Sequence, residues 1–333
     1  MMASAANRRI RKLSYAKYGY MFILPFFLVY FIFSLYPLIY TFVVSTYRAT
    51  GTAVDAEMYF VGVENFKDLL FVDSPVRKQF FQAIGNTLIL WICNFIPQIA
   101  LSLILAVWFT DNRLHVPGKG FFKVVMYMPN IITAASIATL FLSLFGETKY
   151  NPVNQILLSW GWIQEPITFI QTYQIKRGIV SFILAWMWFG NTMVMLMASI
   201  MGINPSLFEA AQIDGANSAQ VFAHITVPSI RPMLVYVGIT SMIGGLQMFD
   251  IPYLFNKGTD IDEYTRTIAI YIFERYSGAT RDYGRSAAAS IILFVITGIL
   301  GAIVFYINSD KDEMAEKKRR RKEAKKLKGG SGF

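Results

Sequence analysis

Six long apolar runs constrain this chain more than any other feature. They cover residues 20–46, 82–109, 124–145, 178–201, 232–255 and 286–307. Only the fifth run contains an acidic or basic residue, Asp250 near its end. A helix needs about 20 apolar residues to cross a bilayer, and lipid offers no hydrogen-bond partner to an open strand. The sequence therefore predicts an all-α, polytopic membrane protein with six transmembrane helices.

Proline residues interrupt several of these runs. Pro25, Pro37, Pro97 and Pro129 fall inside predicted spans, and Pro252 lies near the end of one. Proline has no backbone N–H and its ring clashes with the preceding turn. We expect each of these residues to kink or end its helix.

The distribution of charge predicts the orientation. The chain carries 31 Lys and Arg residues and 21 Asp and Glu residues, a net charge of +10. Six spans place both termini on one side of the membrane, where 19 Lys or Arg residues lie, against 12 on the other side. Lys and Arg are enriched in cytoplasmic loops, so we expect both termini to be cytoplasmic.

This orientation divides the chain into three parts. Residues 1–19 are predicted to form a cytoplasmic N-terminus, residues 20–307 the membrane domain, and residues 308–333 a basic cytoplasmic tail. The basic run at 317–322 is expected to be solvated and to attract anionic membrane lipid, by about 1 kcal/mol per basic residue. Nucleic acid is not an expected partner, because no folded basic domain accompanies the run.

Catalytic and metal-binding signatures are not found in the sequence. No Gly-rich loop ends in Lys followed by Ser or Thr, so the chain is not expected to bind ATP phosphates. Cys93 lies in an apolar run, and His115 and His224 are too isolated to form a metal site. We therefore predict that the chain is not an enzyme and binds no cofactor or metal.

The external segment at 60–70 predicts a turn followed by a short helix. Asn65 is placed to cap this helix, and Phe66, Leu69 and Leu70 share one face. The residues leave two interpretations open, a contact with a partner and a helix that lies on the membrane surface.

The loop at 202–231 has the strongest local signals. Asn204, followed by proline, predicts a helix start, and Gly215 predicts its end, where a left-handed residue costs least. A second short helix is predicted over 218–225, with Pro228 and Pro232 breaking it and starting the fifth span. The pattern alone is equally consistent with a partner-binding element and with an amphipathic connector on the lipid head groups.

The same loop resembles the conserved cytoplasmic loop of binding-protein-dependent ABC importer permeases. That pattern is Glu-Ala-Ala, three residues, Gly, nine residues and Ile-x-Leu-Pro. This chain has Glu209-Ala210-Ala211, three residues, Gly215, nine residues and Ile225-Thr226-Val227-Pro228. Val227 in place of Leu is the one mild departure. The resemblance covers nearly the whole chain and is closest to the first permease subunit of maltose-type carbohydrate importers, with support from Tyr36-Pro37-Leu38-Ile39-Tyr40, Gly62-Val63-Glu64-Asn65-Phe66, Asn86-Thr87-Leu88 and Met128-Pro129-Asn130.

This resemblance implies an element that couples the chain to a motor. The loop would form a coupling helix held by a cytoplasmic ATPase, with Glu209, Ala210, Ala211, Asp214 and Gly215 facing that partner. The implied complex contains a second homologous permease subunit, two ABC ATPase subunits that bind ATP and Mg, and an extracytoplasmic solute-binding protein. Its location would be the plasma membrane of a bacterium or archaeon.

The resemblance also implies a pathway for the solute. Candidate contacts, by similarity to sugar-contacting stretches of the maltose permease, are Trp186, Trp188, Gly190, Asn191, Gln247 and Asp250. Gln247 and Asp250 are three residues apart and are predicted to share one helical face. For the two tryptophans, core or interfacial packing is the competing interpretation.

The function predicted from these observations is ATP-driven import of a neutral sugar or oligosaccharide. The alternative is a self-sufficient secondary transporter of a small neutral solute. A membrane-embedded enzyme is a third class, which would require a cluster of polar catalytic residues. The sequence does not identify the sugar.

Overall fold

The computed structural model describes residues 16–50, 57–111, 117–146, 150–256, 263–278 and 281–308. This part of the chain is helical apart from one antiparallel hairpin, in which Tyr47 pairs with Phe60. The basic tail, residues 1–15 and His115 lie outside the described residues.

The elements are α1 (Ala16–Tyr30), η1 (Phe31–Leu35), α2 (Tyr36–Ser45), β1 (Tyr47–Thr50), β2 (Glu57–Phe60), α3 (Glu64–Leu70), α4 (Pro75–Thr110), α5 (Lys119–Ile131), α6 (Ala134–Phe145), α7 (Pro152–Ser159), α8 (Tyr173–Met201), α9 (Pro205–Ile213), α10 (Ser218–Val221), η2 (Phe222–Thr226), α11 (Val227–Ser229), α12 (Arg231–Leu246), α13 (Asp250–Asn256), α14 (Ile268–Ser277) and α15 (Tyr283–Asn308).

Five segments of the described chain are long and apolar enough to cross a membrane. They are Lys17–Ser45, Pro75–Thr110, Tyr173–Met201, Arg231–Asn256 and Tyr283–Ile303. The run at 124–145 is divided between α5 and α6, which meet at 93°, in agreement with the interruption expected at Pro129. Pro129 removes a helical N–H near the end of α5, and the Thr133 hydroxyl caps α6 by accepting a hydrogen bond from the Ser136 N–H. If this bent pair is one span, the described residues contain six candidate spans.

Two π-helical turns, η1 and η2, explain how helices continue through Pro37 and Pro228. In each turn, the residue before the proline donates its N–H to the carbonyl five residues back, as Tyr36 does in η1 and Val227 in η2. The wider turn accommodates a residue that cannot donate a hydrogen bond. The helical path therefore continues through Pro228 to Ser229, and the interruption falls at Ile230, before Pro232 in the first turn of α12. The expected break is wrong at Pro228 and confirmed at Pro232.

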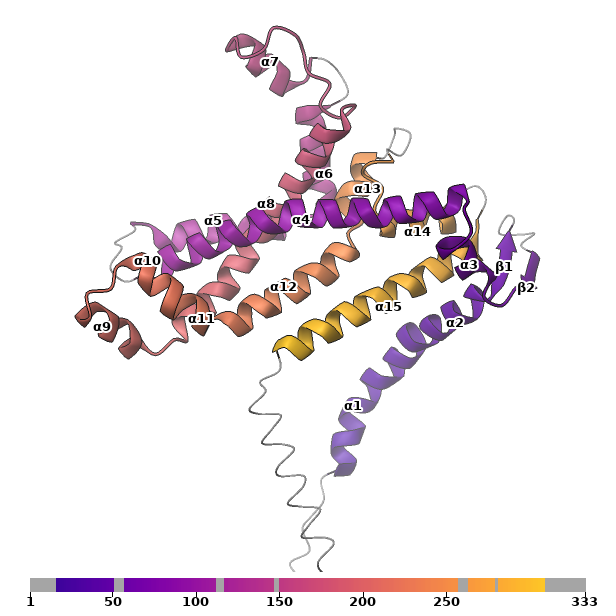
Figure 1. Ribbon diagram of the computed structural model, residues 1–333, viewed down its shortest axis with the longest axis horizontal. Helices are drawn as coiled ribbons and strands as arrows, with labels where there is room; N and C mark the ends of the chain where they lie inside the picture. The colour runs from indigo at the N-terminus through magenta and orange to yellow at the C-terminus, as the bar shows by residue number, and fades with distance from the viewer. Residues whose placement is uncertain are drawn as a thin grey trace, which may run out of the picture.

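α4 and α8 form the central helix pair of the bundle (Figure 1). Two buried polar contacts join them. Gln98 Nε2 donates to Thr192 Oγ1 at 2.8 Å, and Ser102 Oγ is 2.8 Å from the carbonyl oxygen of Phe189. Such contacts hold helices together where lipid gives no hydrophobic drive for association.

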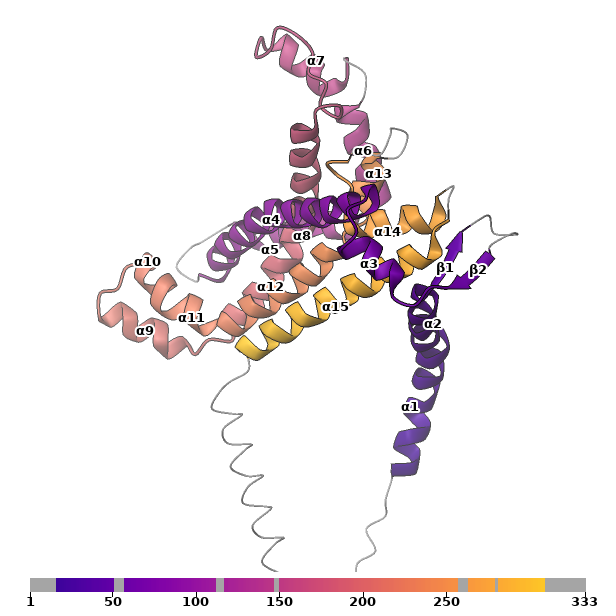
Figure 2. The same cartoon turned by 45° about the vertical axis from the view of Figure 1, so that its right-hand side comes forward.

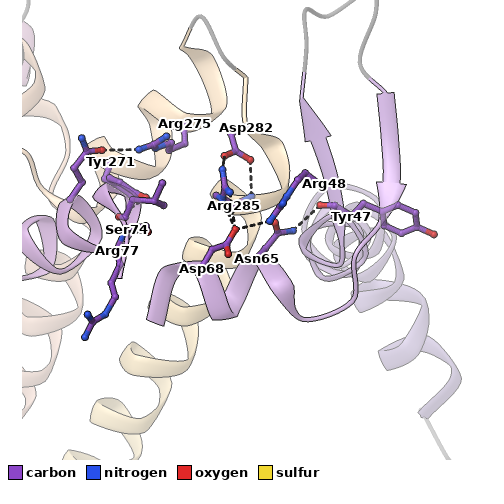
Figure 3. Close-up of polar contacts among 12 residues, drawn as sticks. Tyr47, Arg48, Asn65, Asp68, Ser74, Arg77, Tyr271, Arg275, Asp282 and Arg285 are labelled. Carbon is purple, nitrogen blue, oxygen red and sulfur yellow. Dashed lines mark hydrogen bonds and ion pairs between the residues drawn. The ribbon is translucent and has the colours of Figure 1, made fainter. Parts of the chain in front are cut away.

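The ends of the first and last spans that lie near the β1–β2 hairpin are joined by ion pairs (Figure 3). Asp68 on α3 accepts hydrogen bonds from Arg48 Nη2 of β1 at 2.6 Å and from Arg285 Nη2 of α15 at 2.7 Å. Arg285 also pairs with Asp282, at 2.9 Å. Asp68 therefore holds two arginines from opposite ends of the chain, and we call Arg48, Asp68, Asp282 and Arg285 the Arg–Asp clasp.

The sequence predicted that Asn65 caps α3, and this prediction is wrong. The N-cap is Val63, and the fully buried Asn65 donates its Nδ2 to the carbonyls of Ser45 at 2.9 Å and Tyr47 at 2.8 Å. These carbonyls lie at the end of the first span, where no helical donor remains. The apolar face of α3 packs inside the chain through the buried Leu69 and the half-buried Phe66 and Leu70.

The Arg–Asp clasp predicts a loss of stability when its central carboxylate is removed. The Asp68→Asn variant should lose about 1–3 kcal/mol of stability, because two half-buried guanidinium groups lose a charged acceptor. Thermal unfolding of the purified protein in detergent would measure this change. Asp73→Asn is the control, since Asp73 is 73% exposed in its pairs with Arg77 and Lys78 and should change stability by under about 0.5 kcal/mol. Equal losses of stability in Asp68→Asn and Asp73→Asn would contradict the stabilising role of the Asp68 carboxylate.

Gly190 lets α5 approach α8 closely. A Cβ atom at Gly190 would lie 2.1 Å from the carbonyl oxygen of Met126, whereas a Cβ at Gly178 on the same helix would meet nothing within 4 Å. We predict that Gly190→Ala destabilises the protein by about 1–3 kcal/mol. Gly178→Ala should be neutral or stabilising, because alanine favours helix by about 1 kcal/mol. Thermal unfolding of both variants tests this, and a neutral Gly190→Ala would contradict it.

Candidate functional site

A cavity of about 390 Å³ lies between α4, α8 and α12, beside the break that separates α12 from α13. Its walls combine aromatic rings with amides and hydroxyls. The main lining residues are Trp91, Asn94, Gln98, Trp188, Asn191, Thr192, Tyr236, Thr240, Ser241, Gln247, Met248, Phe249 and Asp250. Among the described residues around this cavity, Asp250 is the one acidic or basic side chain.

Trp91 is held against α12 by packing and by a hydrogen bond. Its Nε1 donates to Ser241 Oγ at 3.3 Å, and its ring stacks on Phe95 with centroids 5.5 Å apart. A Cβ at Gly245 would lie 2.2 Å from Trp91 Cδ1, so the indole reaches α12 only because position 245 has no side chain. This wall of the cavity is therefore preformed.

Four of the six predicted pathway residues meet in this cavity. Trp188 and Asn191 reach it from α8, and Gln247 and Asp250 reach it from the break after α12. Their predicted common helical face is wrong, because α12 ends at Leu246 and Asp250 begins α13. The break, rather than helical periodicity, brings Gln247 and Asp250 to the same cavity.

The other two predicted residues lie elsewhere. Trp186 packs in the core, with its ring 5.9 Å from that of Phe141. Gly190 faces α5, where it permits the contact with Met126. Neither lines the cavity among its described residues.

The sequence interpretation missed the contribution of α4. Trp91, Asn94 and Gln98 follow one another at intervals of three and four, the spacing of a single helical face. Amides are costly inside a span unless they are used. The spacing of these polar residues within an apolar run was the signal that would have identified this wall.

The segment that follows α8 folds largely as predicted. Asn204 Oδ1 accepts the Ser206 N–H at 3.1 Å and caps α9. Gly215 has φ +73°, and the Ala216 N–H bonds to the Ala211 carbonyl at 2.9 Å, as in a Schellman C-cap. Asn217 then opens the next helix in a capping box with Gln220, which the sequence did not indicate.

This segment projects from one end of the bundle, at the opposite end from the β1–β2 hairpin in both views (Figures 1 and 2). Glu209, Ala210, Asp214 and Gly215 are exposed, and the intervening Ile213 is 87% exposed. Ala211, predicted with them, is 8% exposed and faces its own chain. The exposed set forms a narrow surface with an acidic side chain on each side of an apolar residue.

A groove of about 670 Å³ lies beneath this segment. Its lining comes from the ends of α4, α5 and α8 and from α9, α10 and η2. Its charged lining residues are Asp111 after α4, Lys119 and Lys123 of α5, and Glu209 of α9. The segment is therefore a distinct element, rather than a tightly packed extension of the bundle.

Comparison with known proteins agrees with these features. Residues 87–312 match the family described as binding-protein-dependent transport system inner membrane component. The lactose transport system permease protein LacF of Rhizobium radiobacter is 29% identical over 304 residues, which cover 91% of this chain and 98% of that protein. The arabinooligosaccharides transport system permease protein AraP of Bacillus subtilis strain 168 is 30% identical over 295 residues, covering 88% and 90%.

A solved structure shares the fold. It is the crystal structure of a bacterial ABC transporter involved in the import of the acidic polysaccharide alginate, with a TM-score of 0.72, 24% identity, and coverage of 88% of this chain and 95% of that chain. The family match spans more than half of the chain and includes the cavity and the projecting segment. This chain therefore belongs to the inner membrane components of binding-protein-dependent transport systems and is a permease subunit of an ABC importer.

Proposed function

We propose that the cavity between α4, α8 and α12 is part of the import pathway of a neutral sugar or oligosaccharide. The residues that line this cavity are the main support for the proposal. Trp91 and Trp188 offer ring faces, and Asn191 and Gln247 offer amides, with Asp250 the one fixed charge among the described lining residues. Aromatic faces pack against apolar faces of sugar rings, and a few placed polar groups fix orientation.

The names of the relatives support this substrate class. LacF is a lactose permease protein, AraP an arabinooligosaccharides permease protein, and MsmF of Streptococcus mutans a multiple sugar-binding transport system permease protein, 26% identical to this chain. The family also favours the importer over the alternative of a self-sufficient secondary transporter. We expect the separate binding protein to choose among sugars.

The projecting segment would connect the cavity to the motor. Two cytoplasmic ATPase subunits would bind ATP and Mg, and one of them would hold the surface formed by Glu209, Ala210, Asp214 and Gly215. The segment joins the end of α8 to the start of α12, and both helices line the cavity. Movement of the segment would therefore act directly on two walls of the pathway.

In this mechanism the chain forms half of the pore and a second permease subunit forms the other half. Closure of the ATPase dimer would pull the segment and turn the cavity from the cytoplasm toward the binding protein. Return of the ATPases would release the sugar inward. Both termini would lie on the ATPase side.

Removal of an amide from the cavity should slow transport. With Gln247→Ala, we expect the initial uptake rate in proteoliposomes, with saturating loaded binding protein, to fall roughly tenfold, the equivalent of one hydrogen bond. Gln155→Ala is the control, because Gln155 is exposed on α7 and bonds the Tyr150 carbonyl. Uptake that is unchanged in Gln247→Ala would contradict the assignment of the cavity.

Two glycines allow a sharp test of the projecting segment. Gly215 (φ +73°) and Gly161 (φ +71°) are both left-handed, with nothing within 4 Å of an added Cβ. Valine should strain the backbone similarly at both positions. We predict that Gly215→Val abolishes sugar-stimulated ATP hydrolysis or ATPase assembly, whereas Gly161→Val preserves both.

Membrane insertion and expression of the two variants provide the check on folding, and both should match the parent protein. ATP hydrolysis by the reconstituted complex is the measurement. Normal coupling in Gly215→Val, or equal loss in both variants, would overturn the role of the segment.

A further inference from the structure

The break after α12 leaves backbone carbonyls without a helical partner, and a threonine satisfies one of them. The Met248 carbonyl oxygen accepts a hydrogen bond from Thr267 Oγ1 at 2.7 Å. Met248 lies between Gln247 and Phe249 in the wall of the cavity. Thr267 is fully buried, so water does not substitute for this contact.

The same threonine is tied to α4 through its neighbour. Thr267 Oγ1 also accepts the Ile270 N–H, at 3.3 Å, and so caps α14. The residue that follows Thr267 is Ile268, and its N–H donates to Thr87 Oγ1 on α4 at 2.9 Å. Thr87 is fully buried and donates to the Ala83 carbonyl at 2.7 Å. One chain of hydrogen bonds therefore runs from α4 to the break.

A second layer outside these threonines holds the same segment. Asn86 Nδ2 donates to the carbonyls of Glu263 and Arg266. Arg177 on α8 donates to the Tyr264 carbonyl at 2.7 Å and to Asn86 Oδ1. Residues 263–268 are thus bonded to both α4 and α8, and they cannot shift independently of these helices.

The contacts connect the two opposing walls of the cavity. Thr87 lies one helical turn before Trp91, which lines the cavity from α4. Thr267 holds Met248, whose neighbour Gln247 lines it from the break. We propose that Thr87 and Thr267 are positioning residues, whose hydroxyls fix the wall at Gln247–Asp250 relative to the wall of α4. This inference rests on the proposed passage of sugar through the cavity.

Threonine-to-valine changes isolate the hydroxyl, because valine has nearly the same shape. In Thr267→Val, the Met248 carbonyl loses its partner, and in Thr87→Val the Ile268 N–H loses its partner. A buried backbone group without a partner is costly, so the break should relax into another arrangement. Thr267→Ser and Thr87→Ser keep the hydroxyl and should restore the parent behaviour.

The first readout is the ratio of uptake rates for a disaccharide and a tetrasaccharide by the reconstituted complex. We expect each valine variant to change this ratio by about fivefold, and each serine variant to return it to the parent value. A loss of folded protein alone would lower both rates in proportion and leave the ratio unchanged. Thr297→Val is the control, because Thr297 donates only to carbonyls of its own helix, Leu293 and Phe294, away from the cavity.

The second readout does not require sugar. In a Cys93→Ser background, Gln247→Cys places a thiol on the cavity wall, and its alkylation by a water-soluble maleimide reports the position of that wall. We expect Thr267→Val to change the alkylation rate by about fivefold and Thr267→Ser to leave it unchanged. If the parent complex moves neither sugar, the ratio has no value and alkylation alone decides the positioning role. Failure of the proposed function is shown separately, by unchanged uptake in Gln247→Ala. An unchanged ratio together with an unchanged alkylation rate would overturn the inference.

Discussion

The architecture depends on the need to pair every backbone polar group in a medium that offers no water. Each described interruption discussed above has its own solution. Asn65 closes the end of the first span, Thr133 caps α6, and Thr267 takes the carbonyl freed at Met248. At Pro37 and Pro228, where proline removes a donor, a π turn shifts the pairing by one residue. The chain can therefore bend at the cavity without leaving the break unsupported.

The cavity and the projecting segment are connected directly along the chain. α8 carries Trp188 and Asn191 and leads directly to α9, and α11 leads directly to α12 with its own cavity residues. The segment is thus the link between two walls, rather than an appendage to one. A displacement of that link changes the separation of the two walls unless other contacts hold them. Thr87 and Thr267 provide such contacts at the Gln247–Asp250 end of the cavity.

Features that neighbouring residues determine could be predicted from the sequence, whereas features that depend on contacts between distant residues could not. The cap at Asn204 and the left-handed Gly215 depend on a few neighbouring residues, and both predictions are confirmed. The bend between α5 and α6 lies beside Pro129 and the Thr133 cap, which are local features. The break at Gln247 instead involves a partner distant in sequence, Thr267, which hydropathy does not reveal. Asn65 has the chemistry of a cap, but its partners are carbonyls 18 and 20 residues away. Asn191 and Gln247 were identified from resemblance, whereas Asn94 and Gln98 needed the geometry of α4.

The Arg–Asp clasp has a consequence for biogenesis. Asp68 and Arg285 are separated by 217 residues, so α3, which carries Asp68, leaves the ribosome long before Arg285 has been synthesised. At ordinary elongation rates of about 5–20 residues per second, this interval is roughly 10–40 s. During that time Asp68 has only Arg48 from its own half of the molecule. Final seating of the first span is therefore a late event, completed when the last helix leaves the translocation machinery.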